Sequence, residues 1–420
     1  MKHLHGATLI AVLLTGATAT AAFAATRIVV ALPADIRSSM PGTNRDDNTD
    51  SVILNVVEGL VGYGEGGDVK PLLARSVETS ADGLTYTFRL RSDVRFHNGD
   101  KLSSADVLWS WNRYMDPKTE WRCLAEFDGR NDLKVLKVEA PDASTVVMRI
   151  NRRSALFLDT LARTDCGMTG ILSKASVKAD GTWDRPIGTG PFEFSDWKRG
   201  RGITLSRFAG YKSPEGSKPD GYVGLKTPGV DVVQLQVIPD PATVKLGMAS
   251  DVVEVKNDPA LVTSAESDSS KHALLFQTRD PLMADAKFRR AVAAALDYKQ
   301  LVDVASDGLS KPNNSAVFER SVYADATQRK GFKTDLTQAK ALLKESSYRG
   351  QTIKLIANKR SPMPSFQVAL VTQAMLQAIG IKVEIEVLEW ATQLDRYNAG
   401  NYQMMSFSYS GRLDHALSYE

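Results

Sequence analysis

The chain has 420 residues, with 52 lysines and arginines against 49 aspartates and glutamates, and a formal net charge of +3. This balance excludes the strongly basic surface of a nucleic-acid-binding protein, so no nucleic-acid partner is expected. A hydrophobic content of 43% is ordinary for a globular protein and argues against disorder. Because 420 residues can bury more than one core, at least two domains are expected.

Residues 1–24 have the three parts of a cleavable secretory leader. Lys2 supplies the positive end, residues 9–14 the apolar core, and Ala22-Phe23-Ala24 the small-residue cleavage site. A membrane anchor is the alternative, but the apolar core is far shorter than the roughly 20 residues that a spanning helix needs. No cysteine follows the cleavage site, so no lipid attachment is expected there. The mature chain is therefore predicted to be soluble and exported, most simply to a periplasm.

The first predicted element of the mature chain is a strand at residues 26–32. Its consecutive apolar residues Ile28, Val29 and Val30 indicate burial on both faces of a sheet. Residues 38–50 are polar and rich in turn formers, which predicts a loop.

The next stretch, from residue 55, predicts a short helix followed by two antiparallel strands. In the first strand Tyr86, Phe88 and Leu90 alternate with polar residues, the period of a half-buried strand. The second strand starts at residue 94 and is closed by the turn residues Asn98-Gly99.

A capped helix is predicted to follow, because Ser103 lies where an N-cap belongs and Asp106 comes three residues later. Asp116-Pro117 is expected to end this helix. Further strands are predicted at 134–138, 145–150, 203–208 and 232–237, and helices at 156–161, from Asp240, at 288–297 and from Asp335.

The last part of the chain predicts a βαβ unit. It consists of a strand at 353–355, a helix at 366–379 closed by Gly380, and a strand at 383–387. The two strands are expected to be parallel and joined by a right-handed crossover. A helix at 390–398 and a strand at 402–410 follow.

The two cysteines, Cys123 and Cys166, lie in the same predicted domain. In an oxidising compartment an even pair is expected to form a disulfide, which would close a long loop and contribute several kcal/mol. The alternative is a pair of buried thiols. Neither cysteine has the C-x-x-C or metal-site spacing.

Five short segments occur in a fixed order in the motif-rich stretch: EGL at 58–60, PLLARS at 71–76, DGLTYTFRL at 82–90, FHNG at 96–99 and SADV at 104–107. In their order and residues they resemble segments of the extracytoplasmic solute-binding proteins of family 5, the peptide- and nickel-type receptors of ABC importers. One such segment would be weakly specific, but five in register are highly specific. PIGTGPFEF at 186–194 resembles a later segment of the family, and it lacks the G-K-[ST] of a phosphate-binding loop.

The resemblance implies an α/β fold, a two-lobed periplasmic binding protein of type II with an additional inserted domain. The expected parts are a signal peptide at 1–24, lobe I at 25–61 plus 186–274, the inserted domain II at 62–185, and lobe II at 275–420. Family members continue well past residue 420. The chain is therefore expected to be incomplete at its C-terminus, without part of its hinge and main sheet.

The resemblance also implies a function. The chain is expected to be the monomeric, periplasmic substrate-binding component of an ABC importer, which captures a peptide or similar small solute between its lobes and delivers it to the permease in the inner membrane. The solute leaves unchanged, so neither an enzyme activity nor a cofactor is expected. Two alternatives stay open: a periplasmic sensor or chemoreceptor ligand-binding protein, and a nickel or metallophore receptor of the same family.

No catalytic or metal-binding constellation is apparent in the sequence. The mature chain keeps His97, His272 and His415, and none has a partner at i+4. No G-x-S-x-G elbow and no Cys/His nucleophile arrangement stands out. His97 lies in the family's turn segment, where a structural role is expected, and no metal ligand is predicted.

Two regions are the first candidates for the ligand site. The loop with Arg45, Asp46 and Asp47 lines the ligand cleft in the peptide receptors, and a solvated surface loop is the alternative. Arg360 follows the strand at 353–355, where dipeptide-type receptors place an arginine that binds a carboxylate, and an exposed arginine is the alternative. The carboxyl end of a strand in a βαβ unit is the usual ligand edge, and a guanidinium fork suits a carboxylate.

A third candidate region is the segment after the strand at 402–410. The peptide receptors have a W-[TC]-[GA]-D segment here, whose aspartate holds the ammonium group of the peptide. This chain has Arg412 at that place, with Asp414 two residues later. Either Asp414 takes over as the ammonium partner, or Arg412 makes the pocket prefer an anionic group. The predicted ligand-binding set also includes Trp390, Tyr409, Ser410 and Gly411.

Overall fold

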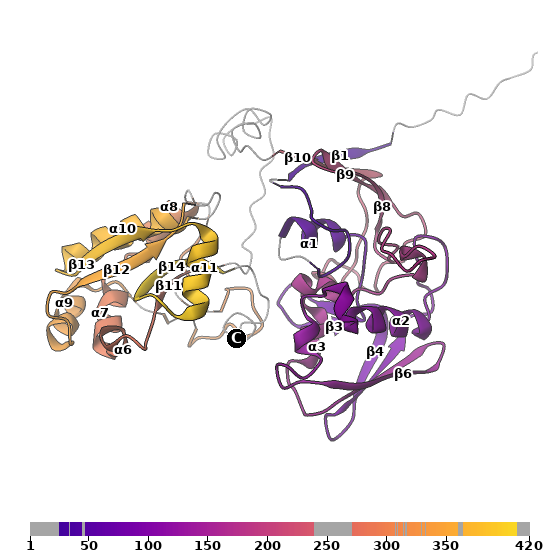
Figure 1. Cartoon of the computed structure of the whole chain (residues 1–420), viewed down its shortest axis with the longest axis horizontal. Coiled ribbons are helices and arrows are strands. Elements are labelled where there is room, and N and C mark those ends of the chain that lie inside the picture. The colour runs from indigo at the N-terminus through magenta and orange to yellow at the C-terminus, as the bar shows by residue number, and fades with distance from the viewer. Residues whose placement is uncertain are drawn as a thin grey trace, which may run out of the picture.

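The computed structural model describes residues 25–32, 34–43, 47–238, 271–306, 308, 310–313, 315, 317–328, 330–331, 333–359 and 364–409. Two large hydrophobic cores lie in these parts of the chain, one within residues 32–235 and the other within 282–404. Figure 1 shows the elements of the first in indigo to magenta and those of the second in orange to yellow. The two cores share no residue.

Four strands form the N-terminal sheet, in the order β1-β10-β9-β8. They are β1 (Arg27–Leu32), β8 (Phe192–Lys198), β9 (Gly202–Arg207) and β10 (Val232–Val237). β1 pairs with β10 in parallel, whereas the other neighbours are antiparallel. The strands predicted at 203–208 and 232–237 are confirmed.

The predicted burial of β1 on both faces is wrong. Ile28 is 48% exposed, Val29 52% and Val30 36%. β1 is the terminal strand in the sheet order, and β10 is its only partner among the described residues. Consecutive apolar residues indicate a buried strand only where other elements cover both faces, and no element in the described ranges does so here.

A second, antiparallel sheet is built from the chain between β1 and β8, in the order β4-β5-β7-β6. Its strands are β4 (Ala74–Thr79), β5 (Thr85–Leu90), β6 (Val135–Asp142) and β7 (Thr145–Ile150). The alternation predicted for β5 is confirmed, because Tyr86, Phe88 and Leu90 are buried and the residues between them are half-buried.

The helix α2 lies against this sheet. It spans Ser104–Met115, contacts β6 and β7, and buries Val107 and Trp111. It begins where the sequence predicts, with the Asp106 carboxylate accepting hydrogen bonds from the backbone N–H and the hydroxyl of Ser103. The helix predicted at 156–161 is confirmed as α3 (Phe157–Ala162).

The strand predicted from residue 94 is wrong. The chain makes only an isolated bridge there, between Arg95 and Lys101, around a turn in which Gly99 has a φ of +87°. The partners of β5 are β4 and β7 instead. The alternation that starts at residue 94 does not continue past residue 96, because His97 hydrogen-bonds to Gly190, which is far away in the sequence.

The short helix also lies earlier than predicted. α1 (Asp47–Ile53) occupies the end of the segment predicted as a loop, with Val52 and Ile53 buried. Its first residues are polar and only its C-terminal end is apolar, so the hydrophobic pattern of the sequence does not indicate a helix there. A small hairpin of β2 (Val61–Tyr63) and β3 (Val69–Pro71) follows.

The C-terminal sheet has the order β11-β14-β12-β13. Its strands are β11 (Lys271–Phe276), β12 (Thr352–Ala357), β13 (Lys382–Val387) and β14 (Met404–Tyr409). β12 is parallel to both β13 and β14, and β11 is antiparallel to β14. The parallel pairing predicted for the βαβ unit is confirmed.

Helices surround this sheet (Figure 1). They are α6 (Pro281–Ala284), α7 (Ala286–Ala295), α8 (Tyr298–Ser306), α9 (Leu336–Glu345), α10 (Ser365–Ala378) and α11 (Trp390–Ala399). α7 and α10 share a core with Ile353, Leu355 and Met404, whereas α11 packs with Met405 and Phe407. None of the helices in the described ranges is long and apolar enough to cross a membrane. The helix predicted from Asp240 lies outside the described residues.

His97 ties the turn segment to the GTGP segment. Its Nε2 lies 3.0 Å from the Gly190 carbonyl oxygen, and its Nδ1 accepts from the Gly188 N–H at 3.3 Å. The two glycines are required because a Cβ on Gly188 would lie 2.1 Å from the Val56 carbonyl oxygen, and one on Gly190 2.5 Å from that of Asn55. Burial lowers the pKa of His97 to about 4, so the ring is neutral at pH 7.

This histidine should make stability depend on pH. The unfolded chain binds a proton at His97 below about pH 6.5, whereas the folded chain binds it only near pH 4. The stabilisation is therefore complete above pH 6.5 and is lost as the pH falls from 6.5 to about 4. Between pH 7 and pH 5 we expect the free energy of unfolding to drop by about 2 kcal/mol from this residue. Urea titrations of the wild type and His97→Gln should show a shallower drop for the variant, and identical pH profiles would contradict the assignment.

Candidate ligand-binding site

Three of the predicted ligand-binding residues lie in the described ranges. Asp47 begins α1, Trp390 begins α11 and Tyr409 ends β14. The others lie outside the described residues: Arg45, Asp46, Arg360, Ser410, Gly411, Arg412 and Asp414.

The parallel strands of the C-terminal sheet bring separate parts of the sequence to one edge. β12, β13 and β14 all end on the same side, so Asn358, Leu388 and Tyr409 lie along what we call the carboxyl edge. Lys271 also lies there, because the antiparallel register pairs it with Tyr409. Polar and charged side chains at such an edge are well placed to bind a ligand.

Aromatic rings bring Trp390 and Tyr409 together at this edge. The Phe407 ring lies between them, with its centroid 5.4 Å from that of Trp390 and 5.0 Å from that of Tyr409. Tyr397 stacks on Phe407 at 4.7 Å, and its hydroxyl is 3.4 Å from that of Tyr409. Such pairs hold each ring in a fixed orientation. The sequence analysis missed Tyr397 and Phe407, although Tyr397 follows Trp390 by two helical turns and so lies on the same helix face.

Two lysines lie at the carboxyl edge. Burial lowers the pKa of Lys271 from its usual range. The ammonium group of Lys359 lies 4.4 Å from the centre of the Phe366 ring, a cation–π arrangement. Neither lysine was predicted as a site residue, although Lys359 immediately precedes Arg360 in the sequence.

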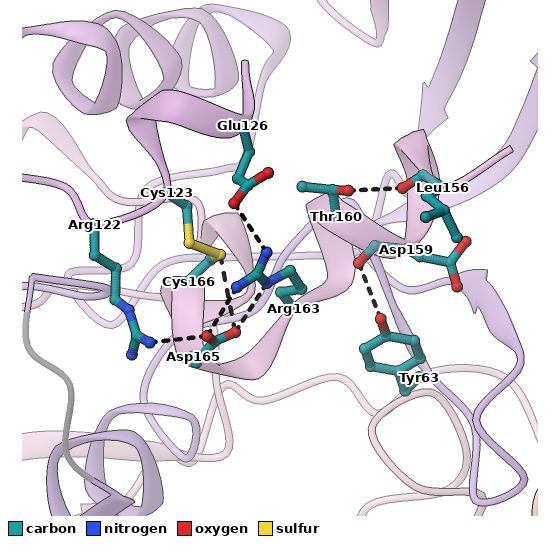
Figure 2. A network of polar contacts seen from close by, with 10 residues as sticks. All are labelled: Tyr63, Arg122, Cys123, Glu126, Leu156, Asp159, Thr160, Arg163, Asp165 and Cys166. Atoms are coloured by element: carbon teal, nitrogen blue, oxygen red, sulfur yellow. Dashed lines mark hydrogen bonds and ion pairs between the residues drawn. A yellow bond between two sulfur atoms is a disulfide. The ribbon is translucent and has the colours of Figure 1, made fainter. Parts of the chain in front are cut away.

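In the N-terminal part, the segments around Cys123 and Cys166 contact Gly42. The structure joins Cys123 to Cys166 by a disulfide bond (Figure 2). The indole N–H of Trp121 donates to the Cys166 carbonyl oxygen at 3.0 Å, and the Arg122 N–H donates to the Gly42 carbonyl oxygen at 3.0 Å. Gly42 has a φ of +68° and no room for a Cβ, which would lie 2.4 Å from the Cys166 oxygen.

Charged groups beside the disulfide are paired with one another. The buried Asp165 carboxylate accepts hydrogen bonds from Arg122 at 2.9 Å and from Arg163 at 3.1 Å (Figure 2). Arg163 also pairs with Glu126 at 3.2 Å. Buried charges that satisfy each other in this way have a structural role, since breaking one pair leaves an uncompensated charge. We therefore do not assign these arginines to the ligand.

Glu58, in the EGL segment, has a structural role as well. Its carboxylate is buried and accepts hydrogen bonds from the Thr189 hydroxyl at 3.1 Å, the Tyr211 hydroxyl at 3.0 Å and the Lys226 ammonium at 2.9 Å. Burial, together with the Glu58 charge, raises the pKa of Tyr211. One carboxylate thus joins three segments that are far apart in the sequence.

Comparison with known proteins identifies the family. The family described as "Bacterial extracellular solute-binding proteins, family 5 Middle" matches residues 68–419. The chain belongs to this family. It has the two-lobed periplasmic binding protein fold that the sequence predicts, and it is a solute-binding protein of the ABC importer type, not an enzyme. Within the described ranges no group of three or more potential metal ligands occurs.

Three relatives illustrate the similarity. The glutathione-binding protein GsiB of Escherichia coli O1:K1 / APEC is 26% identical over 375 residues, which cover 88% of this chain and 71% of the relative. The structure of the PBP AgaA from A. tumefaciens R10, in complex with agropinic acid, is 27% identical with a TM-score of 0.64, covering 91% of this chain and 77% of AgaA. The periplasmic binding protein DppA from Helicobacter pylori, in complex with the peptide STSA, is 26% identical with a TM-score of 0.67, covering 94% of this chain and 81% of DppA.

The disulfide should contribute strongly to stability. It links residues with a sequence separation of 43, and the chain-entropy relation for a loop of this length gives about 4 kcal/mol. We expect the double variant Cys123→Ser/Cys166→Ser to lose roughly this free energy of unfolding in urea titrations. As a control, a reductant should destabilise the wild type by a similar amount and leave the variant unchanged. Two free thiols in a peptide map of the exported protein would contradict the pairing in the native state.

Proposed function

We propose that this protein captures a small solute that carries a carboxylate, a peptide or a compound of similar chemistry, and delivers it unchanged to the permease of an ABC importer. The importer role in this proposal rests on membership of family 5. The carboxyl edge supports the ligand class, because Lys271 and Lys359 lie there beside a cluster of aromatic rings. Arg360 follows Lys359 directly and would add a guanidinium fork.

The proposed site lies between two lobes. Lobe II, residues 275–420, contributes the carboxyl edge, with Trp390, Tyr409 and the residues that follow β14. Lobe I, residues 25–61 plus 186–274, contributes the loop with Arg45, Asp46 and Asp47, and residues 62–185 form the inserted domain. Gly42, just before that loop in the sequence, is held by a hydrogen bond from the Arg122 N–H beside the disulfide. Closure of the lobes would then bury the ligand charges against opposite charges.

The ammonium group of a peptide requires a negative partner. Asp414 is our candidate in lobe II, with Asp46 or Asp47 across from it. Arg412 would instead favour a second anionic group. The relatives illustrate both chemistries, since one is named for glutathione and another is in complex with the peptide STSA.

The leader at residues 1–24 supports export to the periplasm and cleavage after Ala24. We propose that the mature protein acts as a monomer and has no nucleic-acid partner, in keeping with a formal net charge of +3.

Binding without turnover is the first test. Isothermal calorimetry with glutathione, agropinic acid and the peptide Ser-Thr-Ser-Ala should give saturable binding of at least one solute, with a dissociation constant in the micromolar range or tighter, about −8 kcal/mol or better. Mass spectrometry should recover the solute unchanged. Steady formation of a product would overturn the proposal, as would the absence of binding by all carboxylate-bearing solutes tested.

Arg360 provides a second test. Arg360→Ala should weaken binding of the solute identified above by 2 to 5 kcal/mol, roughly 30-fold or more, because a ligand carboxylate would lose its paired charge in the closed cleft. Lys354→Ala is the matched control, since Lys354 is an exposed cation on β12, outside the carboxyl edge. Equal affinities of the two variants would show that Arg360 does not bind the ligand.

A further inference from the structure

A network of hydrogen bonds lies beneath the carboxyl edge and begins at His272 on β11. The ring of His272 contacts two serines of β14, with Nε2 2.8 Å from the Ser406 hydroxyl and Nδ1 2.9 Å from the Ser408 hydroxyl. Nothing in the sequence motifs assigns a role to this histidine, and no step of ligand binding described above uses it.

The hydrogen bonds determine the state of the ring. The Ser406 hydroxyl donates its proton to the Ser365 carbonyl oxygen at 2.7 Å, so it accepts a hydrogen bond from Nε2–H of His272. Nδ1 then carries the lone pair and accepts from Ser408. Burial lowers the pKa of His272 to about 4, which keeps this neutral tautomer at physiological pH.

The network continues from Ser406 to the ends of three other elements. Ser365, the first residue of α10, donates from its hydroxyl to the Ser406 carbonyl oxygen at 2.8 Å and accepts from the Asn358 N–H at 3.1 Å. Gln393 of α11 donates to the same Ser406 oxygen at 3.0 Å and accepts from the Asn358 side-chain amide. All four residues are buried. The first turn of α10 and the middle of α11 are therefore bonded directly to Ser406 of β14, and Asn358 at the end of β12 is bonded to it through Ser365 and Gln393.

We propose that His272 is a positioning residue for ligand binding, an inference that rests on the proposed function. Held between Ser406 and Ser408, its ring fixes the carboxyl half of β14 against α10, and so holds Tyr409 and Asn358 in place at the carboxyl edge. His272 does not touch the ligand. A site whose side chains are already held in the binding geometry loses less conformational entropy when the ligand arrives.

The test compares two variants of β11 in the full-length protein. His272→Leu removes both hydrogen bonds while keeping a side chain of similar size. Leu274→Ala is the matched control, because Leu274 lies on the same face of the same strand, opposite Ser406, and packs against the C-terminal core. The control loses packing and leaves the network intact.

Amide hydrogen exchange of the ligand-free proteins gives the first readout. In His272→Leu we expect exchange about tenfold faster in residues 404–409 and 364–369, because the hydrogen bonds that hold these segments together locally are lost. In Leu274→Ala the faster exchange should spread over the whole C-terminal sheet. His272→Gln, whose amide can both donate and accept, should restore slow exchange. Equal patterns in His272→Leu and Leu274→Ala would overturn the proposal. If His272→Leu does not fold, Ser408→Ala, which removes one donor at the strand end, takes its place.

Affinity gives the second readout. For a solute that binds the wild type, the dissociation constant should rise about tenfold in His272→Leu and stay within about twofold in Leu274→Ala. Local loosening without loss of affinity would overturn the positioning role. If the wild type binds none of the carboxylate solutes, the proposed function fails, while the exchange data still decide whether His272 orders the edge.

Discussion

The parallel pairing of β12 with both β13 and β14 is the constraint on which the proposed ligand site depends. Parallel neighbours end on the same side of a sheet, so three segments separated by tens of residues converge at the carboxyl edge. The antiparallel β11 then adds its first residue, Lys271, to the same edge. α11 packs against the aromatic residues on one face of the sheet, and α10 packs on the core at the other face. The edge itself is defined by the backbone hydrogen bonds between the strands.

The residues that carry the resemblance to the family make structural contacts and do not lie at the carboxyl edge. Glu58, His97 and the glycines of the GTGP segment are engaged in contacts within the N-terminal part of the chain. Gly188 and Gly190 lie so close to the backbone of residues 55 and 56 that no side chain fits. These motif residues therefore have a structural role in the fold of this chain.

The two parts of the chain use charge differently. Next to the disulfide, Asp165 is paired with two arginines, and elsewhere in the N-terminal part Glu58 is paired with Lys226, so these buried charges have a structural role. At the carboxyl edge, Lys271 is the first residue of β11 and Lys359 is exposed, with aromatic rings nearby. Below that edge the network is uncharged. His272 is bonded to Ser406, and Asn358 is bonded to Ser365 and Gln393, all as neutral groups, so this network adds no charge that would compete with a bound anion.

The sequence by itself determined the family, the βαβ unit with parallel strands and the capped start of α2, because these follow from local periodicity, caps and ordered motifs. It also indicated Trp390 and Tyr409 as candidate ligand-binding residues, and the structure places both against the Phe407 ring. Only the tertiary structure decided that Ile28 to Val30 are exposed, that residues 94–96 are not a strand, and that Tyr397, Phe407 and Lys271 meet at the carboxyl edge. The physical reason is that periodicity records which residues are apolar, whereas burial and proximity depend on which distant strands and helices pack against them.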